Sequence, residues 1–223
     1  MIPCYNEQAT IAQIVDAVRA APIANRETIV VDDCSEDGTQ AILEQKVSKT
    51  VDRLIYHAVN RGKRAALRSG FAAATGDILV RDADLEYNPE DCPAFLEPLI
   101  SDQADAVFGS RFMGGRPHRV LFFWHTVGNR FLTLVSNMFT DLNLTDLQSG
   151  YKAFKASVIK SIHIEEDGFG VESELVAKIV SLRCRIFEVG ISYYGRTYEQ
   201  GKKIGWRDGF RALYAIVKYG CRR

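Results

Sequence analysis

Three carboxylates follow one short apolar run of the chain at every second position. Asp82, Asp84 and Glu86 come after residues 78–80, an Ile-Leu-Val run typical of a buried strand. In an extended chain these side chains leave by the same side about 6.6 Å apart, so the two aspartates would repel by about 2.5 kcal/mol at an effective dielectric constant near 20. Mg²⁺ or Mn²⁺ prefers such oxygen ligands and commonly also binds substrate phosphates. The spacing indicates a metal site; a solvated loop leading into a helix is the alternative.

Two further polar clusters also follow apolar runs. Asp32 and Asp33 end the run 28–31, where a carboxylate accepts hydrogen bonds from a ribose or a base, and Gly-Ser-Arg at 109–111 ends the run 104–108. An Asx turn is the alternative for one of the two aspartates. Ligands of parallel sheets bind beyond the carboxyl ends of the strands. Together the three clusters predict a ligand site there.

A basic turn, Asn-Arg-Gly-Lys-Arg at 60–64, comes before an Ala-rich helical stretch. Backbone N–H groups at a helix start, together with Lys63, suit an anion such as a phosphate. A solvated basic turn is the alternative. No GxxxxGK[ST] or GxGxxG pattern occurs, which removes the main support for an ATPase or a dinucleotide-binding protein.

The elements that must position these residues alternate between strands and helices. We expect helices over 11–18, 38–45, 63–74, 89–100 and 172–183, and strands over 28–31, 54–56, 77–81, 104–108 and 185–194. This order predicts an α/β fold with a mostly parallel central sheet flanked by helices. We expect one domain, 1–223, with two halves at 1–112 and 113–223.

The composition fits one globular domain of 223 residues, 47% hydrophobic and 25% charged. The 28 basic and 28 acidic residues balance, which argues against a general nucleic-acid binder. Five scattered cysteines without a CxxC pair favour a reducing cytosol over a disulfide framework. We find no signal peptide and no uninterrupted apolar run of about 18 residues, and therefore expect a cytoplasmic protein.

Seven segments carry a resemblance to a known family. In order they are PCYNE at 3–7, VDDCSEDGT at 31–39, NRGKRAALRSG at 60–70, GDILVRDADLE at 76–86, GSRF at 109–112, DLQSGYKAF at 146–154 and RTYEQGKKIGWRDG at 196–209. Together they resemble the inverting glycosyltransferases of family 2, which have a GT-A fold. The most similar branch resembles dolichol-phosphate mannose or glucose synthases and their bacterial polyprenyl-phosphate relatives.

The resemblance implies a metal-dependent transfer of a hexose from a UDP- or GDP-sugar to a polyprenyl phosphate. It implies a nucleotide-sugar-binding half at 1–112 and an acceptor-side half at 113–223. It implies metal ligation by Asp82, Asp84 and Glu86, with Mg²⁺ or Mn²⁺ as cofactor. It implies donor binding by Pro3, Tyr5, Glu7, Asp32, Asp33, Lys63, Asp82, Gln148, Ser149, Arg196 and Lys203, and catalytic roles for Asp84, Arg111, Asp146 and Glu174.

The acceptor decides whether a base is needed. A polyprenyl phosphate is already anionic, whereas a hydroxyl acceptor requires a base, for which Asp146, Glu172 and Glu174 are candidates. An exposed first helical turn is the alternative for the two glutamates. His125 and Asn129 stand where the synthases have an Arg-rich helix, which weakens the lipid-phosphate interpretation.

Three alternatives remain open from the sequence. They are a family 2 enzyme that uses a hydroxyl acceptor in cell-surface polysaccharide synthesis, a non-catalytic nucleotide-sugar binder, and a sugar nucleotidyltransferase. The stretch 119–139 and the basic tail 202–223 would either pack in the core or lie on the cytoplasmic membrane face. The family's first strand usually starts several residues earlier, so we expect a sheet short at its centre or an incomplete start.

Overall fold

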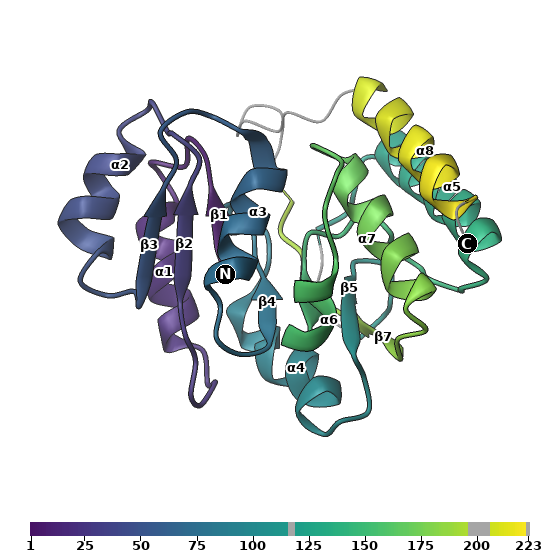
Figure 1. The fold of residues 1–223 in the computed structure, drawn as a ribbon, viewed down its shortest axis with the longest axis horizontal. Coiled ribbons are helices and arrows are strands. Elements are labelled where there is room, and N and C mark those ends of the chain that lie inside the picture. Colours follow the sequence, from purple (N-terminus) through teal and green to yellow (C-terminus); the bar gives the residue numbers. More distant parts are fainter. Residues whose placement is uncertain (116–118, 196–205, 222–223) are drawn as a thin grey trace.

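The structure, a computed structural model, describes residues 1–115, 119–195 and 206–221, without the side chains of residues 206 and 207. Its strands form two groups (Figure 1). The first is wholly parallel in the order β1-β2-β3, with β1 at Ile2–Cys4, β2 at Ile29–Asp32 and β3 at Arg53–Tyr56. The second has the order β4-β6-β5-β7, with β4 at Ile78–Val80, β6 at Lys152–Phe154, β5 at Ala106–Ser110 and β7 at Ile186–Gly190.

The two groups join between β1 and β4 through the backbone of Met1. Its amino group donates to the carbonyl of Leu79 at 2.9 Å, and the N–H of Arg81 donates to the carbonyl of Met1 at 3.1 Å. This is the bonding pattern of parallel neighbours, so the strands follow the order β3-β2-β1-β4-β6-β5-β7. Among the described strands, β6 alone runs antiparallel to its neighbours. The predicted mostly parallel sheet is confirmed, and it is short at its centre, where β1 and β4 each have three residues.

Helices flank these strands, as alternating elements require. The helix α1 (Ile11–Ala20) buries Ile11, Ile14 and Val15, residues at the spacing that predicts it. Further helices are α2 at Thr39–Ile42, α3 at Gly62–Ala73, α4 at Cys92–Ile100, α5 at Phe123–Thr140, α6 at Ala156–Ser161, α7 at Gly170–Ser181 and α8 at Trp206–Gly220. A π-helical turn, η1 (Leu43–Val47), continues α2, and a 3₁₀ turn, η2 (Pro89–Asp91), precedes α4.

Two predicted strands have different bounds, and hydrogen bonds explain both. The strand expected over 185–194 ends at Gly190, because the N–H of Ser192 donates to the Asp91 carboxylate at 2.6 Å and not to a neighbouring strand. The strand expected over 104–108 lies at 106–110, because the N–H of Gly109 donates to the carbonyl of Tyr151 and extends the ladder. The sequence does not predict β6, since three residues are too few to show a period.

The second half of the chain is built around α7, which is buried along most of its length. It packs against α8, and α8 also packs against α5 (Figure 1). The Lys218 ammonium of α8 donates to the Glu166 carboxylate at 2.6 Å, which fixes α8 to the turn before α7. Within the described ranges no helix is both long and apolar enough to cross a bilayer.

Candidate active site

The Asp82–Glu86 loop starts where β4 ends. Leu85 has a φ of 59°, so the backbone leaves the extended conformation, and the three carboxylates do not share one side as an extended chain predicts. Asp84 accepts a hydrogen bond from the N–H of Glu86 at 3.2 Å, and Glu86 accepts one from the Tyr193 hydroxyl at 2.9 Å. The described part of the chain contains no cluster of three or more His, Cys, Asp or Glu residues that could hold a metal. The structure therefore does not bring Glu86 together with the two aspartates.

The Lys63 ammonium, on the first turn of α3, lies between two carboxylates. Its Nζ is 3.2 Å from Asp82 Oδ1 and 3.1 Å from Glu172 Oε1. Although burial opposes the charge, the two carboxylates raise the pKa of Lys63 above its usual value. Burial likewise opposes the charge of Glu172, yet Lys63 and Lys152 hold its pKa below the usual value. The sequence does not predict this contact, because it joins residues 109 positions apart.

The loop 146–151 closes against Asp82. A side chain at Gly150 would displace the Asp82 carboxylate, so glycine here lets the loop approach Asp82 closely. The Lys152 ammonium holds the loop from below by donating to the carbonyls of Leu147 and Ser149. Burial lowers the pKa of Lys152 to about 8.

Gln148 and Ser149, predicted to line the sugar pocket, lie in this loop. The amide nitrogen of Gln148 is 3.5 Å from the Ser173 hydroxyl, while its Oε1 is buried and has no hydrogen-bond donor among the described residues. Such an oxygen fits a hydroxyl donor of a sugar. Ser149 is fully buried, and its hydroxyl accepts from the N–H of Tyr151 at 3.3 Å.

Asp146 and Arg111 form a two-pronged ion pair beside this loop. The Asp146 carboxylate accepts from Arg111 Nε at 2.7 Å, from Arg111 Nη2 at 2.8 Å and from the amide nitrogen of Asn129 at 2.9 Å. Burial opposes its charge, but Arg111 holds the pKa of Asp146 below its usual value. Asp146 therefore orients Arg111, and both of its oxygens are engaged.

Glu174, predicted as a catalytic residue, is not brought to this site. Its fully buried carboxylate accepts from the N–H groups of Glu165 at 2.8 Å and Glu166 at 2.7 Å, and from the Lys178 ammonium at 2.6 Å. It anchors the turn before α7. The alternative of an exposed first helical turn is wrong for both glutamates, since Glu172 is buried as well.

The carboxylates that end β2 are engaged inside the protein. Asp32 accepts from the Ser35 hydroxyl at 2.5 Å and from the Gln40 amide at 2.8 Å. Asp33 accepts from the N–H of Gly62 at 2.6 Å and contacts the His57 ring at 2.6 Å. Asp32 also accepts from the N–H of Ser35, three positions on, and so holds the turn after β2, while Asp33 fixes the start of α3.

The segment PCYNE at 3–7, the first of the seven family motifs, lies beside these residues. Pro3 is buried in β1, Tyr5 is 40% exposed, and Glu7 accepts from the Thr10 hydroxyl at 2.8 Å. His57 is a residue that the sequence prediction missed, although it follows directly on the predicted strand 54–56. Arg196 and Lys203 lie outside the described residues.

Residues 1–162 match the model of the family described as Glycosyl transferase family 2. The chain belongs to this family. It is 29% identical over 234 residues to an undecaprenyl-phosphate mannosyltransferase of Micrococcus luteus, a match that covers 99% of this chain and 92% of that protein. It is 27% identical over 228 residues to a dolichol-phosphate mannosyltransferase of Pyrococcus furiosus, covering 98% of this chain and 63% of that protein.

A solved structure also resembles this glycosyltransferase. It is a glucosyl-3-phosphoglycerate synthase from Mycobacterium tuberculosis, in complex with Mn²⁺, UDP and glucosyl-3-phosphoglycerate. The TM-score is 0.75 at 20% identity, over 99% of this chain and 78% of that chain. This similarity confirms the GT-A fold. The family and the named relatives confirm the prediction of an enzyme of the nucleotide-sugar-dependent glycosyltransferase class.

Two aspartates of this glycosyltransferase, and not three carboxylates, fit a divalent cation. Asp82 and Asp84 are both partly exposed after β4, and two carboxylates completed by phosphate oxygens are a common set for Mg²⁺. A set of three protein carboxylates does not fit, because the described residues hold no group of three that could bind a metal. Asp82 and Asp84 thus fit a divalent cation whose remaining ligands include the oxygens of a diphosphate.

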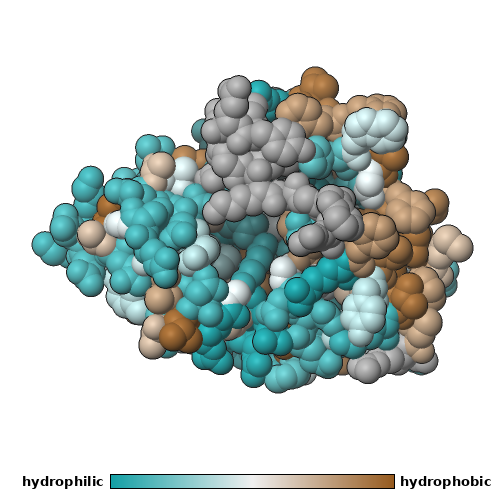
Figure 2. Space-filling view, turned by 90° about the horizontal axis from the view of Figure 1, so that it is seen from above, coloured by the Kyte–Doolittle hydropathy of each residue, from teal (hydrophilic) through white to brown (hydrophobic). Residues whose placement is uncertain are grey.

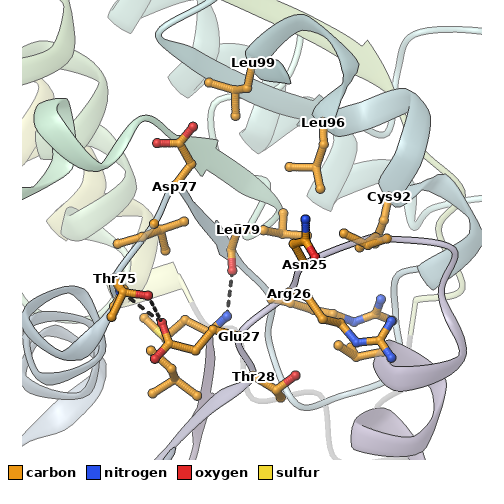
Figure 3. A pocket seen from close by; sticks show the side chains of 18 of the residues that line it. Asn25, Arg26, Glu27, Thr28, Thr75, Asp77, Leu79, Cys92, Leu96 and Leu99 are labelled. Atoms are coloured by element: carbon orange, nitrogen blue, oxygen red, sulfur yellow. Dashed lines mark hydrogen bonds between the residues drawn. The ribbon is translucent and has the colours of Figure 1, made fainter. Parts of the chain in front are cut away.

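A cavity of about 290 Å³ lies elsewhere in the enzyme, at the amino ends of β2 and β4. Figure 3 shows Leu96 and Leu99 of α4 at one side and Glu27, bonded to Thr75, at another. Ligands of such sheets bind at the opposite, carboxyl edge, so this cavity is separate from the candidate site.

Proposed function

We propose that the enzyme transfers a hexose from a UDP- or GDP-sugar to a polyprenyl phosphate with inversion at the anomeric carbon. Asp82 and Asp84 would hold Mg²⁺ or Mn²⁺, which, when bound, supplies positive charge for the departing diphosphate. Lys63, on the first turn of α3 and within reach of both Asp82 and Glu172, would keep a second positive charge near the same group.

The remaining polar groups orient the reactants. Asp146 fixes the Arg111 guanidinium, which would bind a phosphate of the donor or the acceptor. The unpartnered Oε1 of Gln148 would accept a hydrogen bond from the sugar. Such fixed donors and acceptors favour the transition state because they need no reorganisation during the reaction.

One observation favours a phosphate acceptor over a hydroxyl acceptor: each candidate base is already bonded to other groups of the protein. Asp146 is bonded to Arg111, and Glu174 is bonded to backbone N–H groups away from the site. Glu172 is paired with Lys63. An acceptor phosphate oxygen attacks the anomeric carbon as the bond to the nucleoside diphosphate breaks, and no proton has to be removed. The names of the relatives from Micrococcus luteus and Pyrococcus furiosus support the same acceptor class.

An apolar outer face on α5 and α8 supports a lipid acceptor at a membrane surface. Trp124 is 78% exposed and Met138 is 76% exposed, at opposite ends of one stripe. The stripe comprises Trp124, Val127, Phe131, Leu134 and Met138 on α5, with Phe210, Tyr214 and Val217 on α8. Figure 2 shows hydrophobic residues gathered at this end of the molecule, whereas the opposite end is mainly hydrophilic. Such a face would lie on lipid without spanning it.

The test supplies UDP- and GDP-hexoses with Mn²⁺ and four acceptors: polyprenyl phosphate in vesicles, a short soluble prenyl phosphate, polyprenol and a free sugar. We expect glycosyl-phosphate products with both phosphates and none with either hydroxyl acceptor. Transfer to a hydroxyl alone would reject the proposed acceptor.

The same assay tests the apolar face. A Trp124→Glu/Phe131→Glu variant should lose activity with vesicles and retain it with the soluble prenyl phosphate. Ile100→Glu, at a 77% exposed apolar residue that ends α4, is the matched control and should behave like the wild type. Equal loss with both phosphate acceptors would argue against membrane contact.

A further inference from the structure

Lys63 is bonded to a residue that the proposed metal would also need. Its ammonium lies 3.2 Å from one oxygen of Asp82 and 3.3 Å from the other, so it covers both. A divalent cation and an ammonium repel each other at such short range, and they compete for the same oxygens. The cation can bind Asp82 fully only if Lys63 moves.

Glu172 offers the place to which Lys63 can move. One of its oxygens already accepts from Lys63, at 3.1 Å. The other, Oε2, is buried and has no hydrogen-bond donor among the described residues. A buried carboxylate oxygen without a donor is costly, so it favours the approach of a positively charged group.

The packing beside Glu172 leaves room for this movement. A small cavity of about 10 Å³, close to the volume that one water-sized group occupies, lies beside Lys63 and Glu172. Its other lining residues are Gly150 and Lys152 and the apolar Leu67, Val80, Phe154, Val171 and Leu175. An ammonium group is of similar size. The Lys63 side chain is 29% exposed, which leaves it freer than a core side chain.

We infer that Lys63 is an exchangeable counter-ion: it neutralises Asp82 in the metal-free enzyme and passes to Glu172 when a divalent cation binds Asp82 and Asp84. This inference rests on the proposed function. It assigns Glu172 the role of a positioning residue that receives Lys63, and not that of a base. Before nucleotide binds, Lys63 therefore weakens metal binding.

The test is a titration of the enzyme with Mn²⁺ alone, in which free Mn²⁺ is measured by its electron paramagnetic resonance signal. Removing the competing ammonium in Lys63→Met should tighten Mn²⁺ binding about tenfold. Glu172→Gln should weaken binding about threefold, because Lys63 loses its second partner and stays on Asp82. Arg68→Met, on the exposed face of α3, removes an equal charge elsewhere and should change little.

The double variant separates exchange from a general loss of negative charge. If Glu172 acts through Lys63, adding Glu172→Gln to Lys63→Met should have no effect on Mn²⁺ affinity. A simple field effect would weaken binding equally in both backgrounds and would overturn the inference. So would unchanged or weaker Mn²⁺ binding in Lys63→Met, including the case in which neither that variant nor the wild type binds Mn²⁺ alone. Absence of Mn²⁺ binding even with UDP or GDP present would instead reject the metal part of the proposed function.

Discussion

The carboxylates at the ends of β2 and β4 look alike in sequence but differ in their partners. Asp32 and Asp33 are buried and accept from donors that are fixed parts of the fold: backbone N–H groups, a serine, a glutamine and a histidine. Asp82 is partly exposed, and it pairs with the side-chain ammonium of Lys63. A carboxylate with fixed partners builds the site, whereas one with a movable partner can exchange it for a ligand.

The largest effect is expected from a substitution of Asp84, in the loop that follows β4. Asp84→Asn removes one charge from the proposed metal pair, and we expect a loss of activity of about a thousandfold. Stability should change little, because Asp84 is not buried in the core. Activity with Mn²⁺ and the thermal shift caused by nucleotide with Mn²⁺ are the measurements.

Asp16→Asn, on the exposed face of α1, is the matched control for the loss of one carboxylate. If Asp84→Asn keeps its metal-dependent stabilisation by nucleotide, the assignment of Asp84 to the metal is wrong.

A smaller effect, on the free energy of unfolding, is expected from a substitution of Asp146, whose carboxylate is paired with Arg111. The pKa of Asp146 is below its usual value in the folded enzyme, so the group stabilises the fold above its unfolded pKa of about 3.9 and loses this contribution as the pH falls further. Asp146→Asn should therefore lower the free energy of unfolding by about 3 kcal/mol at pH 7. Urea unfolding between pH 7 and pH 3 measures it.

The difference between wild type and Asp146→Asn should shrink as the pH falls below about 4. A difference that stays constant over the whole range would show that lost packing, and not the ion pair with Arg111, causes the destabilisation.

The sequence predicts the edge of the sheet at which the site lies, because apolar runs end there in Asp32, Asp82 and Gly109. It does not predict partners, since local periodicity carries no information on contacts between distant segments. The Lys63–Glu172 pair is one such contact, and the Arg111–Asp146 pair, 35 positions apart, is another.

The sequence could have shown that Glu172 and Glu174 do not both belong to the site. Neighbours two positions apart on a helix point in directions about 200° apart, so only one of them can face a given site. Glu172 faces Lys63, and Glu174 faces the backbone of Glu165 and Glu166. Which of the two faces the site depends on how α7 packs, and that is a property of the whole fold.

The smallest effect is expected from a substitution of Asp33. It tests the contrast between β2 and β4 most directly. Asp33→Asn keeps one acceptor oxygen but loses the charge that the N–H groups of Arg61 and Gly62 and the His57 ring now share. We expect the free energy of unfolding to fall by about 2 kcal/mol. Metal affinity should remain unchanged, because no hydrogen bond or ion pair joins Asp33 to Lys63 or Asp82 in the described structure. Urea unfolding and donor binding, measured on the same preparation, distinguish the two roles. Unchanged stability with lost donor binding would place Asp33 among the ligand-exchanging carboxylates, and the contrast between β2 and β4 would then fail.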